Sequence, residues 1–246
     1  MTDHDTGAAI VTGGSGGIGA AVARRLAADG YRVVVHYGRN GEAAQAVVRD
    51  IEADGGRAIA AAADLAEPGG AGLLFDAAER AFGPAAALVN NAGMMRLSPI
   101  AEADDATFAQ HVDVNLGGVF RGMREAARRL ADGGRIVSIS SSVVGLYQPG
   151  YGLYAATKAA VEALTHVLAK ELGPRGISVN AVAPGPVGTG FFLEGKSDAQ
   201  VAAIAGMNPF GRLGEPDDIA RVVSFLAGPE GGWINGQIIR ANGGVV

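Results

Sequence analysis

Cysteine is absent from the 246 residues of this chain, so the sequence excludes disulfide bridges and metal sites built on thiolates. Charged residues make up only 18% and aromatic residues 6%, whereas 48% of the residues are hydrophobic. A disordered chain would carry more charge and less apolar material. The length therefore fits one large α/β domain or two small ones, with enough apolar residues for a substantial core.

Basic runs and long apolar runs are also missing. The net charge is −5 and the basic residues are scattered, so nothing in the sequence favours nucleic acid as a partner. No stretch of about 18 or more consecutive apolar residues occurs, and residues 1–5 are acidic and lack the apolar part of a secretory leader. We therefore expect a cytoplasmic protein with no membrane or nucleic-acid partner.

Glycine, by contrast, is abundant at 39 residues, and its densest cluster lies at residues 12–19, Thr-Gly-Gly-Ser-Gly-Gly-Ile-Gly. An apolar run precedes this cluster at 8–11, and apolar residues at helical spacing follow it over 20–26. Glycine lets such a turn adopt positive φ angles and bring its N–H groups close to a pyrophosphate. The helix that follows directs its positive dipole end at the same anion. The pattern therefore predicts a phosphate-binding turn between a strand and a helix.

Two registers of these glycines fit a dinucleotide-binding turn. Gly14, Gly16 and Gly19 match the spacing G-x-G-x-x-G, and Gly13, Gly17 and Gly19 match the spacing T-G-x-x-x-G-x-G. Spacing alone does not choose between them, and a glycine-rich turn can also be purely structural. The strand before the turn and the helix after it favour the phosphate-binding interpretation.

Strands and helices alternate along the whole chain without a linker. The predicted strands are 8–11, 31–37, 57–62, 87–91, 135–140, 177–182 and 237–240. The predicted helices, after the one at 20–26, are 42–53, 73–82, 105–130 and 151–172. This alternation predicts a single α/β domain, 1–246, with a doubly wound seven-stranded parallel sheet and helices on both faces. Ligands of such sheets bind beyond the carboxyl ends of the strands.

The end of the second strand selects the cofactor. A carboxylate at this point usually holds an adenosine 2′-hydroxyl, whereas an arginine attracts a 2′-phosphate. Residues 36–40, His-Tyr-Gly-Arg-Asn, contain no acid and one arginine. We therefore predict a preference for NADP(H), with Arg39 on the 2′-phosphate. Arg39 can equally be an ordinary solvated residue, so NAD(H) remains an alternative.

Polar residues also follow the third and fourth strands. Asp64, followed by Leu65, can place a carboxylate beside the adenine amino group, or it can simply begin a helix. Residues 90–93, Asn-Asn-Ala-Gly, offer amides close to the path of the cofactor, although asparagine pairs are common in turns.

The strongest chemical signal is the pair Tyr154 and Lys158, which follows the three serines 140–142 at the end of the fifth strand. Residues four apart on a helix project from nearly the same face. A lysine ammonium favours the phenolate and lowers a tyrosine pKa that is otherwise about 10, which makes the tyrosine a usable acid or base. Alone, the pair could be a surface pairing. Its position after a serine cluster and a dinucleotide turn favours a catalytic role, with one serine bonding the substrate oxygen.

Taken together, these residues resemble the short-chain dehydrogenase/reductase family over essentially the whole chain. The motifs that carry the resemblance, in the order of the family, are 12–19 (which selects Gly13, Gly17 and Gly19), 90–93, Tyr154 with Lys158, Pro184-Gly185 and 212–220. The resemblance implies a Rossmann fold and hydride transfer between a nicotinamide and a carbonyl or alcohol carbon.

The resemblance also implies roles for individual residues. Tyr154 would be the catalytic acid/base, Lys158 would hold the nicotinamide ribose and tune Tyr154, and Asn115 would order a water in the proton relay. The expected cofactor contacts are Gly13, Ser15, Gly17, Ile18, Gly19, Arg39, Asp64, Leu65, Asn91, Ala92, Gly93, Tyr154, Lys158, Pro184, Gly185, Val187 and Thr189. No metal is expected.

Three departures from the family pattern affect these expectations. Gly16 stands where NADP users of the family often carry a basic residue, which leaves Arg39 as the main argument for NADP. The serine is ambiguous: the pattern Ser-x-x-Gly selects Ser142, which we prefer, and a spacing of thirteen to the tyrosine selects Ser141. Asn242 replaces an aspartate often found before the paired glycines, a position expected to be structural and without effect on the chemistry.

The substrate-covering segment is predicted at 186–210, with Met94, Met95 and Tyr151 as further pocket residues. The chain resembles 3-oxoacyl-[acyl-carrier-protein] reductases, which implies a small carbonyl or alcohol substrate such as a 3-oxoacyl thioester. The family commonly pairs the helices expected at 105–130 and 151–172 across subunits, which implies a homotetramer. The alternatives are an NAD-dependent alcohol dehydrogenase of the same family and a nucleotide-binding regulatory protein without turnover.

Overall fold

The centre of the fold is a seven-stranded parallel sheet with the strand order β3-β2-β1-β4-β5-β6-β7. The computed structural model describes residues 6–246, so the expectation about a leader at 1–5 lies outside the described residues. The strands are β1 (Ala8–Val11), β2 (Arg32–Tyr37), β3 (Arg57–Ala62), β4 (Ala85–Asn90), β5 (Arg135–Ile139), β6 (Ser178–Pro184) and β7 (Ile238–Ala241). The predicted doubly wound sheet is confirmed, and the order reverses direction between β1 and β4, where such sheets bind ligands.

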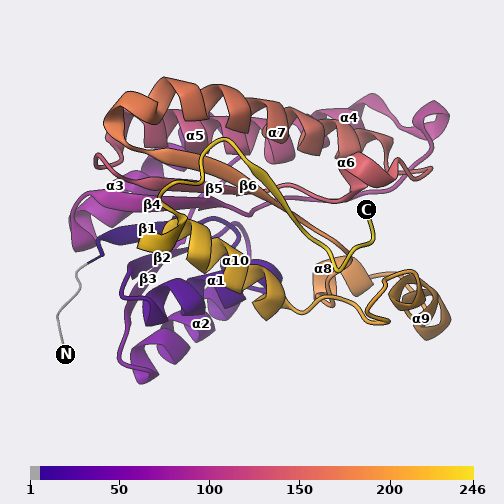
Figure 1. Ribbon diagram of the computed structural model, residues 1–246, viewed down its shortest axis with the longest axis horizontal. Helices are drawn as coiled ribbons and strands as arrows, with labels where there is room; N and C mark the ends of the chain where they lie inside the picture. Colours follow the sequence, from indigo (N-terminus) through magenta and orange to yellow (C-terminus); the bar gives the residue numbers. More distant parts are fainter. Residues whose placement is uncertain (1–5) are drawn as a thin grey trace.

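Helices cover both faces of the sheet (Figure 1). One face carries α1 (Gly17–Ala28), α2 (Gly41–Ala53) and α10 (Pro216–Ala227), and the other carries α3 (Gly70–Phe82), α5 (Gly118–Arg129) and α7 (Gly152–Leu172). Each helix turns an apolar stripe inward; α1, for example, buries Val22, Ala23 and Leu26. The central strands β1, β4 and β6 are almost entirely buried, and β1 and β4 therefore read as nearly continuous apolar runs.

The helix expected over 105–130 is interrupted. It consists of α4 (Asp105–His111), the π-helical turn η2 (Val112–Gly117) and α5. A π-helical turn inserts one extra residue per turn and redirects the side chains that follow it. In this chain the turn aims Asn115 inward, where it is completely buried. Periodicity does not reveal such a turn, because the sequence on either side continues to read as helix.

Three short elements lie near the ends of β5 and β6. The loop expected at 145–152 starts with the helical turn α6 (Val143–Leu146), which ends at Tyr147 with a φ of 49°. The predicted substrate-covering segment contains α8 (Gly190–Leu193) and α9 (Asp198–Gly206), which project beyond the sheet at the end where the C-terminus lies (Figure 1). Neither α8 nor α9 contains a buried residue.

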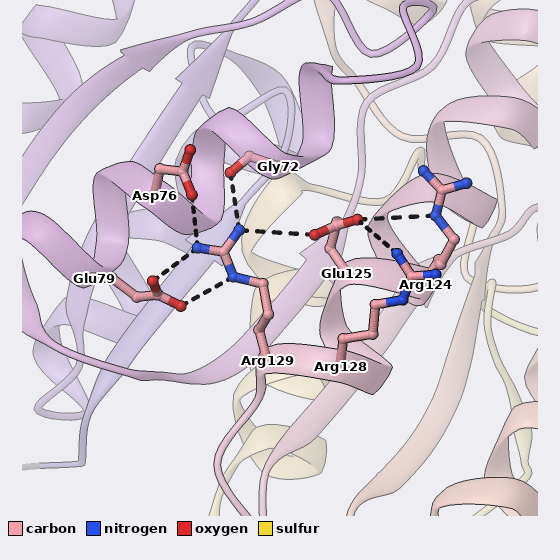
Figure 2. Close-up of polar contacts among 7 residues, drawn as sticks. All are labelled: Gly72, Asp76, Glu79, Arg124, Glu125, Arg128 and Arg129. Carbon is pink, nitrogen blue, oxygen red and sulfur yellow. Dashed lines mark hydrogen bonds and ion pairs between the residues drawn. The ribbon is translucent and has the colours of Figure 1, made fainter.

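A cluster of charges fastens α3 to α5 on the face that also carries α7 (Figure 2). The guanidinium of Arg129 donates to both carboxylate oxygens of Glu79, at 3.0 and 2.8 Å, and to Asp76 at 2.7 Å. Glu125 lies 3.7 Å away on the same helix, and the ring of Phe75 lies 5.4 Å below the guanidinium. The bonds to Glu79, followed by the bond to Asp76, raise the pKa of Arg129. Bidentate charge-assisted bonds of this kind hold two helices in a fixed relative position.

Within residues 6–246, no helix is both long enough and apolar enough to span a bilayer.

Candidate active site

The carboxyl ends of β1, β4, β5 and β6 surround a cavity of about 470 Å³. This cavity brings together most of the residues that the sequence singles out. Its lining contains Gly13, Ser15, Gly17, Ile18, Asn91, Ala92, Gly93, Ser141, Ser142, Tyr154, Lys158, Pro184, Gly185, Val187 and Thr189. Residues from five separate stretches of the chain therefore share one site at the edge of the sheet where ligands are expected.

The glycine turn has steric requirements that decide its register. Gly13 and Gly17 have φ angles of 63° and 52°, which side chains rarely adopt. A Cβ on Gly19 would lie 2.1 Å from the carbonyl oxygen of Gly13, whereas a Cβ on Gly16 would have nothing within 4 Å. The turn therefore requires glycine at 13, 17 and 19. It fits a pyrophosphate, because α1 begins at Gly17 and its N-cap, Gly16, forms no side-chain cap on the first N–H groups.

Hydrogen bonds with the end of β4 hold this turn in place. The hydroxyl of Thr12 donates to the carbonyl oxygen of Val89 at 3.2 Å and accepts from the N–H groups of Asn91 and Ala92 at 2.9 and 3.0 Å. The amide of Asn91 donates to the carbonyl oxygens of Thr12 and Gly13 at 2.9 and 3.1 Å. The amide nitrogen of Asn91 is therefore bonded to the turn. Its side-chain oxygen remains as the group that could accept a hydrogen bond from a ribose.

Tyr154 and Lys158 lie on the buried face of α7, as their spacing predicts. The ammonium of Lys158 donates to the carbonyl oxygen of Ile139 at 2.7 Å and lies 5.6 Å from the centre of the Tyr154 ring. Burial lowers the pKa of Lys158 to about 8. Burial also raises the pKa of Tyr154 to about 12, against the lowering effect of a hydrogen bond with Ser141 and with a smaller contribution from Tyr151. The expected lowering of the Tyr154 pKa is absent in this structure, because desolvation outweighs the hydrogen bond with Ser141.

The two candidate serines differ in what their hydroxyls contact. Ser142 is buried, and its hydroxyl donates to the carbonyl oxygen of Ala183 at 3.2 Å and accepts from the amide of Asn242 at 2.9 Å. Ser141 is half-buried and hydrogen-bonds Tyr154. This geometry favours Ser141 over the preferred Ser142 as the partner of Tyr154. The same geometry connects Asn242 to Ser142, the residue next to Ser141, although Asn242 was expected to have no effect on the chemistry.

Asn115 is not part of the cavity lining. Its side-chain oxygen accepts from the N–H of Met94 at 2.7 Å, and its amide donates to the carbonyl oxygen of Met94 at 2.8 Å. The amide also approaches the hydroxyl of Thr157 at 3.4 Å. Asn115 therefore ties η2 to the segment that follows β4 and to α7.

The residues expected around the adenosine lie outside the cavity, beyond the ends of β2 and β3. Arg39 is exposed, next to the residue that caps α2. Asp64 is also exposed, and its carboxylate accepts from the N–H of Ala66 at 2.9 Å. Leu65 packs its side chain into the core, and its carbonyl oxygen accepts from Arg121 at 3.0 Å.

Part of the apolar wall was not predicted residue by residue. Besides the expected Met95, Tyr151, Phe191 and Phe192, the lining contains Leu146, Gln148, Ile204, Met207 and Val245. Met94, which was expected there, is not among the lining residues. Ile204 and Met207 lie within the predicted covering segment, but nothing in the sequence connects Val245 with a loop some hundred residues earlier, since only the fold brings the chain end to this edge.

The covering segment is fixed at both ends. At its start, the hydroxyl of Thr189 accepts from the N–H of Phe192 at 3.3 Å and caps α8. At its end, the amide of Asn208 donates to the carbonyl oxygen of Asn242 at 2.9 Å, and its oxygen accepts from the N–H of Phe210 at 2.8 Å.

Comparison with known proteins gives consistent matches over the chain. A family model described as enoyl-(acyl carrier protein) reductase matches residues 13–246. A short-chain type dehydrogenase/reductase of Picea abies is 48% identical over 248 residues, which cover 97% of this chain and 92% of the relative. An NADPH-dependent aldehyde reductase-like protein of Arabidopsis thaliana is 44% identical, covering 97% of this chain and 93% of the relative.

A solved structure agrees with these relatives. The crystal structure of a short chain dehydrogenase from Burkholderia cenocepacia J2315 in complex with NADP superimposes with a TM-score of 0.92, at 43% identity and with 98% of each chain covered. Fold, site geometry and sequence identity over nearly the whole length therefore lead to one conclusion. The chain belongs to the short-chain dehydrogenase/reductase family.

Proposed function

We propose that the chain is an NADP(H)-dependent oxidoreductase that reduces the carbonyl group of a neutral, largely apolar small molecule, with Tyr154 as the proton donor. The observation that carries the proposal is the shared cavity: the hydroxyls of Ser141 and Tyr154 line it together with the glycine turn. A site that only bound a nucleotide would need the turn but not this pair.

Bound NADPH supplies the hydride for such a reaction. The turn with Gly13, Gly17 and Gly19, together with the free N–H groups at the start of α1, would hold its pyrophosphate. Lys158 would hold the nicotinamide ribose. In these assignments, the glycine turn and Lys158 bind and orient the cofactor.

In the proposed mechanism, Ser141 donates a hydrogen bond to the carbonyl oxygen of the substrate and Tyr154 donates the proton that converts this oxygen into a hydroxyl. A pKa of about 12 keeps Tyr154 protonated near neutral pH, as a proton donor must be. The ammonium of Lys158, held by the carbonyl of Ile139, stabilises the phenolate that remains. The raised pKa favours reduction at neutral pH, and the reverse oxidation, which needs the phenolate, should accelerate as the pH rises.

The substrate class follows from the lining of the cavity. Lys158 is the one charged side chain among the lining residues of the described chain, and the remainder of the wall is mainly apolar, with uncharged polar residues such as Ser141, Thr189 and Gln148. A neutral aldehyde or ketone with an apolar body fits this wall. The Arabidopsis thaliana relative, by its name an NADPH-dependent aldehyde reductase-like protein, supports an aldehyde as the substrate. A 3-oxoacyl thioester is the second candidate, supported by the apolar wall, which can take an acyl chain.

The test of the proposed function is the oxidation of NADPH, and separately of NADH, in the presence of a panel of carbonyl compounds. The panel contains aliphatic and aromatic aldehydes, cyclic ketones and a 3-oxoacyl thioester. We expect turnover of at least one neutral carbonyl compound with NADPH preferred over NADH. Cofactor binding without turnover of any compound would favour a nucleotide-binding regulatory protein, and a preference for NADH would favour an NAD-dependent dehydrogenase.

Arg39 provides a test of cofactor choice. Replacing Arg39 with alanine should raise the dissociation constant for NADPH about tenfold and leave that for NADH nearly constant, because a charge-assisted bond to the 2′-phosphate is lost. Both constants can be measured by cofactor fluorescence. The control is Arg49→Ala, an exposed arginine on α2. An equal loss for both cofactors would remove Arg39 from the 2′-phosphate site.

We also propose that the chain forms a homotetramer and is located in the cytoplasm. Phe108, Phe120 and Val167 expose apolar side chains on α4, α5 and α7, which supports pairing of these helices between subunits. Sedimentation should give a particle of about four times 24.7 kDa, and a monomer would contradict this assembly.

A further inference from the structure

His36 is a buried histidine at the carboxyl end of β2 that takes no part in the proposed mechanism. Its Nδ1 accepts a hydrogen bond from the N–H of Gly13 at 2.9 Å, and its Nε2 lies 3.1 Å from the carbonyl oxygen of Ala63. Only 3% of the residue is exposed. Because a carbonyl oxygen can only accept, Nε2 must carry the proton, and Nδ1 remains the acceptor for Gly13. The two partners therefore select one tautomer of the neutral ring.

Gly13 is held from both sides by this arrangement. Its N–H is bonded to His36 on β2, and its carbonyl oxygen accepts from the amide of Asn91, at the end of β4. Its φ of 63° allows both groups to point at these neighbours. The next N–H, that of Gly14, donates to the backbone carbonyl of His36 at 2.8 Å. The first peptides of the turn are thus oriented by the strands on either side of β1.

We propose that His36 is a positioning residue for the cofactor turn, whose Nδ1 holds Gly13 in the conformation that directs the following N–H groups toward the pyrophosphate. The inference rests on the proposed use of NADP(H). Without the acceptor, the N–H of Gly13 has no partner, and the turn populates other conformations. The apparent affinity for the cofactor falls in proportion to the fraction of chains whose turn is still competent.

A protonated His36 cannot perform this function, because Nδ1 would then carry a hydrogen that faces the N–H of Gly13. Burial lowers the pKa of His36, and the carbonyl of Ala63 and the charge of Asp64 act in the opposite direction. Asp64, at the end of β3, is the charged side chain that acts on His36 from the elements packed against it. Affinity that depends on the neutral ring is present above this lowered pKa and is lost as the pH falls through it.

Two substitutions of similar size separate the two bonds of His36. In His36→Asn, the oxygen Oδ1 is attached to Cγ as Nδ1 is, so it can accept from Gly13 but cannot reach Ala63. In His36→Gln, the amide lies one bond further out, where it can donate to Ala63, and the δ position offers Gly13 no acceptor. Glutamine is closer to histidine in volume than asparagine is. If His36 only filled space, His36→Gln would therefore keep more of the cofactor affinity than His36→Asn.

The experiment is a fluorescence titration of NADPH into the wild-type chain and both variants, with thermal unfolding as the check of folding. We expect His36→Gln to raise the dissociation constant about tenfold at about pH 7.5, and His36→Asn to raise it by less than about threefold. Equal affinities of the variants, or the opposite order, would overturn the inference. Failure of the wild-type chain to bind NADPH would instead contradict the proposed function, and this inference with it.

A pH series gives a second readout that holds even where one variant folds poorly. The 2′-phosphate of NADPH itself titrates near pH ~6, so the affinity of any variant changes with pH. The informative quantity is therefore the difference between the pH dependence of the wild-type affinity and that of His36→Asn. Over a pH range that extends below the lowered pKa of His36, the wild-type affinity should fall further than that of His36→Asn, which carries no titratable ring. Parallel curves over that whole range would overturn the inference.

Discussion

Replacing Tyr154 with phenylalanine is expected to lower the rate of carbonyl reduction by about a thousandfold or more, with the affinity for NADPH within about threefold of wild type. The substitution removes only the hydroxyl that would donate the proton. It leaves the buried ring on α7 beside Lys158, which is bonded to the carbonyl of Ile139 independently of Tyr154. The measurement is NADPH oxidation with a substrate found in the panel, together with a fluorescence titration of the cofactor.

The matched control for this variant is Tyr147→Phe. Tyr147 is 79% exposed and is not among the residues that line the cavity, so the loss of its hydroxyl should change the rate less than about twofold. A Tyr154→Phe variant that keeps more than about a tenth of the wild-type rate would contradict the assignment of Tyr154 as proton donor, because general acid catalysis contributes more than that.

Replacing Gly19 with alanine is expected to weaken NADPH binding by about a hundredfold or more and to lower the free energy of unfolding by about 1–3 kcal/mol. The added Cβ would lie 2.1 Å from the carbonyl oxygen of Gly13 and 2.5 Å from the amide nitrogen of Asn91. Both atoms belong to the bonds that fix the turn, so the chain can relieve the overlap only by moving the phosphate-binding backbone itself.

Gly16→Ala is the control for this prediction, because it adds the same methyl group three residues earlier, where nothing lies within 4 Å and the backbone is extended with a φ of −170°. Its affinity for NADPH and its unfolding midpoint should stay close to those of wild type. If both alanine variants lost affinity equally, flexibility of the turn rather than the steric overlap at Gly19 would be the cause.

The sheet and the helices α1, α2, α3, α5 and α7 could be predicted because apolar runs and helical periodicity are local properties, whereas α10 was not among the predicted helices. Gly13, Gly17 and Gly19 could be singled out only through the family resemblance, since spacing alone allowed two registers; the structure supplies the physical reason, which is the contact between Gly19 and the carbonyl of Gly13. The π-helical turn around Asn115 depends on a tertiary bond to Met94, which no periodicity encodes.

The choice between the two serines could not be made from the sequence for a related reason. Sequence spacing gives the distance along the chain, but the strand end directs Ser142 toward Ala183 and Asn242 and leaves Ser141 for Tyr154. His36 could not be predicted, because the residues at the end of the second strand indicate only whether a carboxylate is present for the ribose. A buried histidine whose partners are backbone groups leaves no sequence signature.

The two anchors of the covering segment have an evolutionary consequence. Because Thr189 and Asn208 fix its ends and α8 and α9 bury no residues, substitutions between the anchors change the wall of the cavity at little cost in stability. Tyr154 and the glycine turn belong to other elements and are not disturbed. Descendants of such a chain can therefore diverge in substrate while they keep the same reaction. For the same reason, mutant libraries confined to residues 190–206 are an efficient way to obtain variants with new substrates.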